Sequence, residues 1–328
     1  MVPSHRLGLA EPALIFSFAR QKWRGWQDRP FGSLREFSVG SRQSNGASPS
    51  PPTAHPTWNP IMSHFSAVCE AAARAGGRVL QDWVGRFKVS AKGPRDLVTE
   101  ADFASQREIK RLVLEAFPDH GFLGEESLPE AEALVKQTAT GLRWIVDPLD
   151  GTTNYVHGIP AYCVSVALAR GNDILAGTIF DPVLNECFTA EAGGGARLNG
   201  EPIAVASTQT LAEAVVAVGF PPHVTAEAPA VADFLSVVPH ASAMRRTGST
   251  AINLAYVACG RFDAFWVRRI APWDVAAGLL LVAEAGGHVA TLAADREAPV
   301  CLDDPAFIAA ATPAVLEELR RLLPPNPH

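Results

Sequence analysis

The sequence predicts a layered α/β fold with a substantial antiparallel sheet. Segments in which apolar residues recur every three or four positions alternate along the chain with short apolar or alternating segments. The first pattern is typical of amphipathic helices and the second of strands. The chain has 328 residues, 48% of them hydrophobic, which is enough to bury a substantial core between such elements.

The first 61 residues differ from the rest in composition. They hold seven Arg or Lys and three Asp or Glu, whereas the whole chain has a net charge of −6. Residues 40–61 are rich in Ser, Pro, Gly and Asn, a composition that buries too little apolar surface to offset its ordering entropy. We predict a disordered or extraneous N-terminal extension over residues 1–61 and one catalytic domain over residues 62–328.

Three interpretations of this extension remain open. It is Arg-rich and acid-poor, as organelle transit peptides are. It can equally be an upstream extension ahead of a start at Met62, or a natural tail. The start at Met62 is favoured, because an amphipathic pattern begins there at once.

The predicted elements follow in chain order from these patterns. Two amphipathic helices come first, Ser63–Trp83 and Thr99–Phe117, and Pro118 ends the second. The short apolar segment Arg143–Asp147 predicts a buried strand. Three further strand-like segments, separated by Gly, Asn and Pro, predict an antiparallel meander over residues 161–170, 173–182 and 186–192.

The C-terminal half repeats the alternation of helices and strands. Strands are predicted over residues 213–220, 262–267, 286–290 and 306–312. Helices are predicted over residues 249–260 and 272–285 and from Pro313 onward.

Several classes of protein are disfavoured by the sequence. The five cysteines are widely spaced and include no CxxC, which indicates a reducing compartment, the cytoplasm, rather than a disulfide framework or a zinc cluster. No apolar run is long enough to span a bilayer. The acidic body does not favour nucleic acid binding, and no P-loop or kinase signature is visible.

Acidic residues recur beside turn residues where apolar segments end. DLVTEAD places Asp96 and Asp102 around the start of a helix that Thr99 can cap. FLGEES places Glu125 after a short apolar run, and WDVAAG places Asp274 in the first turn of a helix. Taken singly, a helix cap, a surface turn or the helix dipole explains each of these acids.

The segment DPLDGTT carries a sharper signal. Asp147 and Asp150 follow a buried strand, and two carboxylates this close raise each other's pKa. A divalent cation would offset the repulsion, and hard oxygen donors suit Mg²⁺. Gly151 and Thr152 then present N–H groups where a helix begins, which suits a phosphate group. Adjacent metal and phosphate sites predict metal-assisted phosphoryl chemistry.

Together these segments resemble the sequence blocks of the inositol monophosphatase family, in the family's order: DLVTEAD, GEES, DPLDGTTN and WDVAAG. RRTGSTA, at Arg245–Ala251, is similar to the family's Arg-x-Gly-Ser-Ala segment. The similarity extends from Met62 to Leu323. It implies the family's layered α-β-α-β-α sandwich and Mg²⁺-dependent hydrolysis of a small phosphate monoester by metal-activated water.

The resemblance also implies a role for each matching residue. One Mg²⁺ would be held by Glu125, Asp147 and the carbonyl of Leu149, and a second by Asp147, Asp150 and Asp274. A third, weaker ion would be reached through water from Glu125 and Asp102. The catalytic residues implied are Asp102, Thr152 and Glu125. The substrate contacts implied are Gly151, Thr152, Thr153, Gly248, Ser249 and Thr250, and Arg268 is added as a predicted substrate contact from the residues themselves. Lys92 is matched to the family's loop lysine near the metals.

One position departs from the family pattern. Val267 stands where many members have a carboxylate that grips substrate hydroxyls, and Arg268 and Arg269 follow it. An arginine there is suited to a second phosphate or a carboxylate. Inositol monophosphate is the first substrate predicted, and the alternatives are histidinol phosphate, a sugar bisphosphate and a nucleotide 3′-phosphate. A non-catalytic, metal-binding regulatory protein is the alternative of another class. The resemblance further implies a homodimer, and the acidic charge and the lack of a long apolar run predict no nucleic acid or membrane partner.

Overall fold

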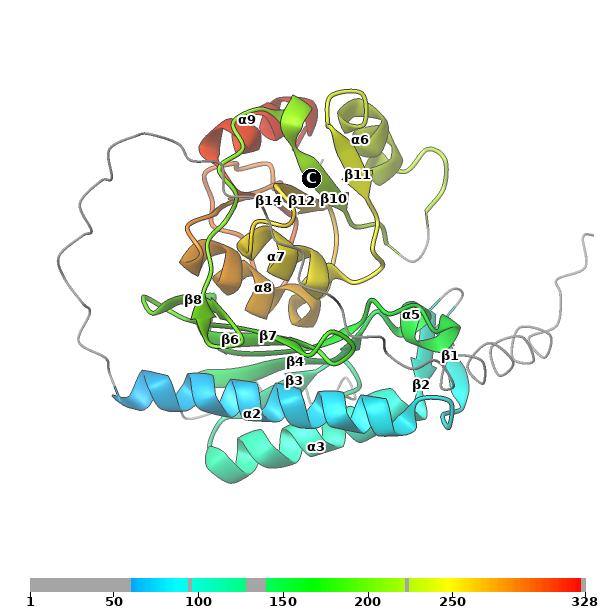
Figure 1. Cartoon of the computed structure of the whole chain (residues 1–328), viewed down its shortest axis with the longest axis vertical. Helices are drawn as coiled ribbons and strands as arrows, with labels where there is room; N and C mark the ends of the chain where they lie inside the picture. Colours follow the sequence, from blue (N-terminus) through cyan, green and yellow to red (C-terminus); the bar gives the residue numbers. More distant parts are fainter. Residues whose placement is uncertain (1–59, 94–95, 128–139, 222–223, 326–328) are drawn as a thin grey trace, which may run out of the picture. The chain divides into compact units, whose positions relative to one another are not determined.

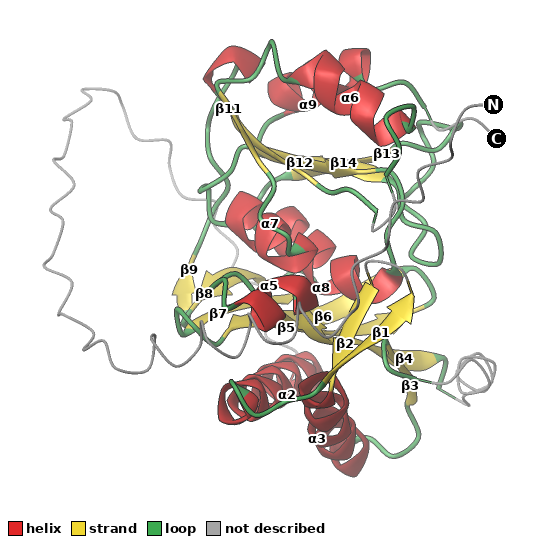
Figure 2. Ribbon diagram, turned by 90° about the vertical axis from the view of Figure 1, so that its right-hand side faces the viewer, coloured by secondary structure: helices red, strands yellow, loops and turns green. Residues whose placement is uncertain are grey.

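Helices and sheets of the computed structural model form five alternating layers (Figures 1 and 2). The structure describes residues 60–93, 96–127, 140–221 and 224–325. From bottom to top in Figure 2 the layers are a helix pair, a large sheet, a second helix pair, a smaller sheet and a third helix pair. The predicted α-β-α-β-α sandwich is therefore confirmed.

The first layer holds α2 (Pro60–Trp83) and α3 (Glu100–Ala116). Their apolar faces pack in one core cluster with the large sheet, and Leu80 is fully buried there. Thr99 caps α3, because its hydroxyl accepts the N–H of Ala101 at 3.1 Å. Both predicted helices and the predicted cap are confirmed.

The second layer is a sheet with the strand order β3-β4-β5-β6-β7-β8-β9. Its strands are β3 (Gly121–Gly124), β4 (Leu142–Asp150), β5 (Cys163–Arg170), β6 (Asp173–Asp181), β7 (Glu186–Glu191), β8 (Gly195–Leu198) and β9 (Glu201–Pro202). β3 and β4 run parallel, and the later neighbours run antiparallel, which confirms the predicted meander. Helices cover both faces, and this explains why the central strands are apolar runs rather than alternating.

The middle layer holds α7 (Thr250–Ala258) and α8 (Pro272–Glu284), which lie between the two sheets (Figure 2). α8 is apolar on nearly every side because it packs on both sheets and on α7. The two helices approach closely at Gly278, where an added Cβ would lie 2.5 Å from Leu254 Cβ. Any larger residue at Gly278 would displace α8, whose first turn carries Asp274.

The fourth layer is a smaller sheet with the order β11-β10-β12-β14-β13. Its strands are β10 (Val215–Val218), β11 (Ala243–Arg245), β12 (Ala264–Val267), β13 (His288–Thr291) and β14 (Phe307–Ala310). β10 runs parallel to β11 and β12, and β14 runs antiparallel to β12 and β13. The outer layer holds α6 (Pro229–Val237) and α9 (Pro313–Leu322).

Several short elements were not predicted from the sequence. β1 (Val89–Gly93) and β2 (Asp96–Thr99) form a hairpin that was missed, whereas α5 (Thr152–His157) begins where the sequence predicted a helix N-terminus after β4. The 3₁₀ helix η1 (Leu211–Glu213), three short strands (β8, β9 and β11) and α6 were also missed. Segments of two to nine residues hold too few apolar positions to show a period. The β1–β2 hairpin and α5 matter most, because both lie beside the candidate site.

The predicted extension over residues 1–61 lies outside the described residues, except that Pro60 and Ile61 begin α2. The domain boundary at residue 62 therefore stays a prediction. Across the described residues, no helix has both the length and the apolar character needed to cross a membrane.

Candidate metal centre

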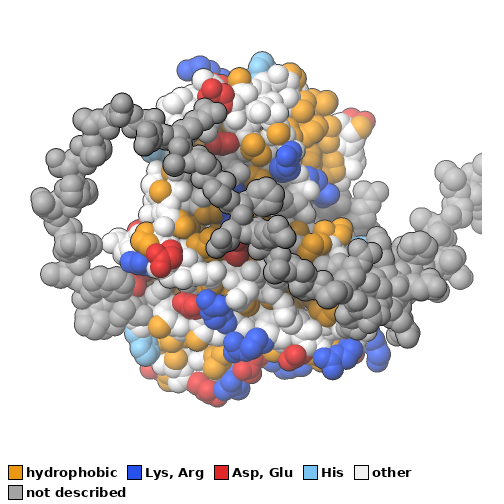
Figure 3. Space-filling view, viewed as in Figure 1, with side chains coloured by type: hydrophobic (Ala, Val, Ile, Leu, Met, Phe, Trp, Pro, Cys, Tyr) orange, Lys and Arg blue, Asp and Glu red, His pale blue; other side chains and the backbone are white. Residues whose placement is uncertain are grey.

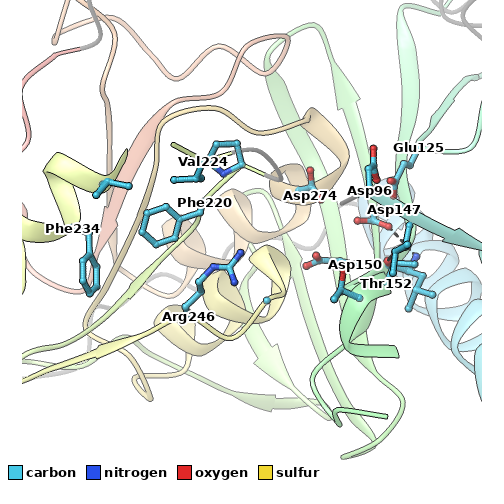
Figure 4. A pocket seen from close by; sticks show the side chains of 17 residues that line it. Asp96, Glu125, Asp147, Asp150, Thr152, Phe220, Val224, Phe234, Arg246 and Asp274 are labelled. Atoms are coloured by element: carbon cyan, nitrogen blue, oxygen red, sulfur yellow. Dashed lines mark hydrogen bonds between the residues drawn. The ribbon is translucent and has the colours of Figure 1, made fainter. Parts of the chain in front are cut away.

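Three carboxylates from distant parts of the chain converge where β4 ends. Asp147 and Asp150 come from β4, and Asp274 comes from the first turn of α8 (Figure 4). One carboxylate oxygen from each lies within 4.8 Å of the other two. Asp147 and Asp150 are buried and Asp274 is half-buried. The sequence predicted this set, and the structure brings it together.

A bulge in β4 explains how Asp147 and Asp150 reach the same side. In a regular strand, residues three apart point to opposite faces. The register with β5 shifts between them: Asp147 pairs with Ser165 and Asp150 with Cys163, so three steps along β4 oppose two along β5. The extra residue restores a common direction. The N–H of Leu149 then donates to Asp147 Oδ1 at 2.9 Å and fixes that carboxylate.

Asp274 is positioned by the start of α8. Its Oδ2 accepts the N–H of Ala271 at 3.2 Å, and an acid in the first turn of a helix is favoured by the helix dipole. Ser165 Oγ donates to the carbonyl of Trp273 at 3.1 Å, which ties the start of α8 to β5. Ser165 also pairs with Asp147 across the β4–β5 ladder. One residue therefore links the strand that carries Asp147 to the helix that carries Asp274.

Asp150 is held by the N-terminus of α7. Ser249 Oγ and the N–H of Ala251 donate to Asp150 Oδ2 at 2.7 and 2.6 Å. Burial raises the pKa of Asp150 to about 6, although these hydrogen bonds act in the opposite direction. Ser249 and Ala251 both donate to Oδ2 of Asp150, which leaves Oδ1 as the oxygen without a hydrogen bond from these two residues.

The electrostatics of the carboxylate cluster favour a bound cation. Burial, and then the carboxylates of Glu125, Asp274 and Asp150, raise the pKa of Asp147 well above its usual value. The pKa of Asp274 is raised in the same way, by burial first and then by Asp150 and Glu125. These donors are all oxygen, the ligand type that Mg²⁺ prefers. The described residues therefore fit the Mg²⁺ that the sequence predicted.

Glu125 and Lys92 form the outer side of the cluster. Glu125 follows β3, and its N–H donates to the carbonyl of Val146 in β4 at 3.1 Å. The β1–β2 hairpin brings Lys92 Nζ to 2.8 Å from Glu125 Oε1 and 2.5 Å from Glu126 Oε1. Burial lowers the pKa of Lys92, but the two carboxylates outweigh this effect and raise it. The predicted place of Lys92 near the acids agrees with the structure.

Asp102 and Thr152 lie together where α3 and α5 begin; Thr152 lines the pocket, whereas Asp102 is buried behind it and is not a lining residue. Asp102 Oδ2 accepts from the N–H and the hydroxyl of Thr99, at 2.9 and 2.6 Å. Thr152 Oγ1 lies 3.3 Å from Asp102 Oδ1 and 3.1 Å from the carbonyl of Leu149, so its one proton serves one acceptor at a time. Burial raises the pKa of Asp102 to about 6, against the hydrogen bonds from Thr99.

Gly151 begins the turn that leads into α5. Its φ of +98° lies in the left-handed region, where a side chain is strained. An added Cβ there would also lie 2.9 Å from the carbonyl oxygen of Ala161. Gly151, Thr152 and Thr153 line the same pocket as the carboxylates, and so does Gly248, which lies against Asn154 of α5. These four predicted contacts are therefore brought to the pocket.

Three other predicted substrate contacts are not among the lining residues. Ser249 is buried beneath Asp150, and Thr250 begins α7 behind it. Arg268 forms an ion pair with Asp233 of α6 and donates to the carbonyl of Pro324 at 2.9 Å. Because these partners engage its guanidinium and Arg268 is not a lining residue, its role in substrate binding stays a prediction. Ser249 becomes a positioning residue for Asp150.

Sequence reasoning missed part of the pocket. The missed lining residues are Asp96, Leu97, Phe220, Pro221, Val224, Val231, Phe234 and Arg246. Asp96 and Arg246 stood in segments already singled out, four residues after Lys92 and two before Gly248. Leu97 comes from β2, and the other apolar residues come from the segment after β10 and from α6; no sequence pattern indicates that these last segments face the acids.

Ser249→Ala tests the support of Asp150. We expect Mg²⁺ affinity to fall by about tenfold, because a residue that orients a metal ligand is lost. The free energy of unfolding should fall by about 1 kcal/mol, because Ser249 also caps α7. Thr312→Ala removes the cap of α9, remote from the pocket, and should match the stability loss at unchanged affinity. Calorimetric titration measures the affinity, and equal affinities in the two variants would contradict the assignment.

Comparisons with known proteins agree with this geometry. The chain matches the inositol monophosphatase family over residues 62–326. It is 43% identical over 227 residues to a protein named inositol-1-monophosphatase from Rhizobium meliloti, covering 68% of this chain and 83% of that protein. It is 40% identical over 222 residues to a protein named Nus factor SuhB from Xylella fastidiosa, covering 66% and 78%.

The fold comparison gives the same result. A crystal structure of extragenic suppressor protein suhB from Bartonella henselae has a TM-score of 0.71 and 38% sequence identity, covering 78% of this chain and 97% of that chain. The chain belongs to the inositol monophosphatase family.

Proposed function

We propose that this chain is a phosphoric monoester hydrolase that acts on a small phosphate monoester, with inositol monophosphate as its first candidate substrate. The observation that carries the proposal is the convergence of Asp147, Asp150 and Asp274 beside the Gly151–Thr153 turn. The carboxylates supply oxygen donors for a cation, and the turn supplies N–H groups for phosphate. The names of relatives such as the Rhizobium meliloti protein support the choice of substrate.

The cofactor proposed is Mg²⁺, in two or three ions. Asp147, Asp150 and Asp274 would hold one ion, and Glu125, Asp147 and the carbonyl of Leu149 another. Glu125 and Asp102 would reach a weaker third ion through water. When bound, Mg²⁺ would neutralise phosphate oxygens and lower the pKa of a nearby water.

The side chains around the donors have separate roles in the proposed reaction. The N–H groups of Gly151 and Thr152 hold the phosphate. Thr152 Oγ1 orients the attacking water, accepts a proton from it and donates its own hydroxyl proton to Asp102 Oδ1, which lies 3.3 Å away. The water oxygen forms a bond to phosphorus, the bond from phosphorus to the ester oxygen breaks, and that oxygen takes a proton.

A panel of phosphate monoesters tests this function. The panel contains inositol 1-phosphate, histidinol phosphate, a sugar bisphosphate and a nucleotide 3′-phosphate, each with and without Mg²⁺. We expect release of phosphate only with Mg²⁺, and the highest kcat/KM for inositol 1-phosphate. A chain that binds Mg²⁺ but releases phosphate from none of them would instead be the non-catalytic regulatory protein.

We also propose that the chain acts in the cytoplasm as a homodimer, with no nucleic acid or membrane as partner. Five free cysteines support a reducing compartment, and the net charge of −6 opposes nucleic acid binding. The dimer rests on the family resemblance. Light scattering of the purified chain measures the oligomer, and a monomer at micromolar concentration would contradict it.

A further inference from the structure

The pocket extends well beyond the carboxylates. It has a volume of about 760 Å³, and its lining includes a second wall that we call the distal wall. The distal wall consists of Phe220, Pro221, Val224, Val231, Phe234 and Arg246. In Figure 4 the labelled members of this wall lie on one side of the pocket, and the carboxylates lie on the other. A leaving group long enough to extend across the pocket from a phosphate at the carboxylates would therefore meet the distal wall.

The chemistry of the distal wall favours a planar apolar group. Apart from Arg246, its side chains are apolar. Hydroxyls of a leaving group would lose water there without gaining partners from these side chains, whereas an aromatic ring would gain contact. The rings of Phe220 and Phe234 lie 6.1 Å apart at 57°; both are half-buried, and both line the pocket, where a ligand can meet them.

Arg246 adds a single positive charge to this apolar wall. Its side chain is exposed, and its guanidinium carbon lies 5.7 Å from the centre of the Phe220 ring. Among the residues that the structure describes, no carboxylate forms an ion pair with Arg246. Arg268, by contrast, is occupied by Asp233. The guanidinium of Arg246 is thus available to an anionic group of a ligand.

The distal wall is held in place by contacts behind it. Asp233 of α6 is 2% exposed and pairs with Arg268, which follows β12, so α6 is anchored to the smaller sheet. The N–H of Gly219 donates to the carbonyl of Trp266 at 3.1 Å and fixes the chain just before Phe220. Because these contacts hold the distal wall in place without a ligand, binding should cost little conformational entropy of the protein.

We propose that the distal wall is a leaving-group subsite for a phosphate monoester that carries an aromatic ring and a carboxylate. The ring packs on Phe220 and Phe234, and the carboxylate pairs with Arg246. The proposal rests on the proposed function, because the same centre performs the same hydrolysis: water oxygen bonds to phosphorus, and the aryl oxygen leaves and takes a proton. It adds a class of substrate to inositol monophosphate.

Two matched esters test the subsite: 3-(4-phosphonooxyphenyl)propanoate and 4-propylphenyl phosphate, which differ only in the carboxylate. With the full chain and Mg²⁺, we expect a kcat/KM about tenfold higher for the ester with the carboxylate. Arg246→Ala should remove this preference, and Arg246→Lys should retain part of it. Arg245→Ala is the matched control, because Arg245 is exposed, donates to the carbonyl of Met244 and is not a lining residue.

The aromatic part of the subsite is tested by Phe220→Ala. This variant should lower kcat/KM for both aryl esters more than for inositol 1-phosphate, because only the aryl esters pack on the ring. Unfolding temperatures of all variants show whether they remain folded.

Three results would overturn the subsite. The first is equal kcat/KM for the two esters in the unsubstituted chain. The second is an equal loss for every substrate in Arg246→Ala, which would place Arg246 at the transferred phosphate. The third is loss of the preference in Arg245→Ala as well. Failure of the proposed function is distinct, because inositol 1-phosphate and both aryl esters would then release no phosphate.

Discussion

Replacement of Asp147 by Asn should lower the rate of phosphate release by about 10³-fold or more while the chain stays folded. Asp147 is 1% exposed and lies among the carboxylates of Glu125, Asp150 and Asp274. Asn retains an oxygen that can accept the N–H of Leu149, so the local geometry survives. The substitution removes one negative charge from the donors proposed to share two ions.

Asp263→Asn is the matched control for this variant. Asp263 is also buried, but it lies before β12 in the smaller sheet, where its Oδ2 accepts the N–H of Val215 at 2.7 Å. We expect this variant to keep phosphate release, because Asn can accept the same hydrogen bond. Circular dichroism and unfolding temperatures confirm folding of both. Wild-type release by Asp147→Asn would show that the site assignment is wrong.

The metal-free chain should unfold at a temperature that is lower at pH 7.5 than at pH 5, by roughly 5 °C or more. The folded pKa of Asp150 is about 6, above the usual 3.8, and those of Asp147 and Asp274 are also raised by burial. An acid with a raised folded pKa binds its proton more tightly in the folded state. The folded state therefore loses stability as pH rises from about 4 through 6.

Saturating Mg²⁺ should offset the loss of folded-state stability that we expect as pH rises. It binds the folded carboxylates in competition with protons, so it should raise the unfolding temperature more at pH 7.5 than at pH 5. Asp147→Asn should reduce both the pH effect and the Mg²⁺ effect, because one of the repelling charges is gone. Asp263→Asn should leave both unchanged. Scanning calorimetry measures the four conditions, and a Mg²⁺ effect equal at the two pH values would contradict the coupling.

Most of the fold could be predicted because its longer elements carry local periodic patterns. The helices α2 and α3 show apolar residues at helical spacing, and the meander β5–β7 shows apolar runs between turn residues. The strand order of the smaller sheet follows from pairing between residues far apart, such as Val216 with Ala264, which no local pattern records. The nine-residue helix α6 was missed for a related reason: a helix this short is marginal by itself, and contacts with distant residues such as Arg268 stabilise it.

The acidic half of the site could be predicted because its residues stand in compact motifs. Asp147 and Asp150 are three apart, and the bulge that aligns them lies within the motif itself. The distal wall could not be predicted, because Phe220 and Arg246 belong to separate segments that meet only in the folded chain. The pairing of Arg268 with Asp233, 35 residues away, is another contact that no local sequence pattern records.

Anomalous diffraction from crystals soaked in Mn²⁺ tests the central claim most directly, because Mn²⁺ takes the same oxygen donors as Mg²⁺ and scatters anomalously. We predict at least one strong anomalous peak among the carboxylates of Asp147, Asp150 and Asp274. Crystals with no peak there at saturating Mn²⁺, and with those three carboxylates apart, would contradict a metal centre at this position.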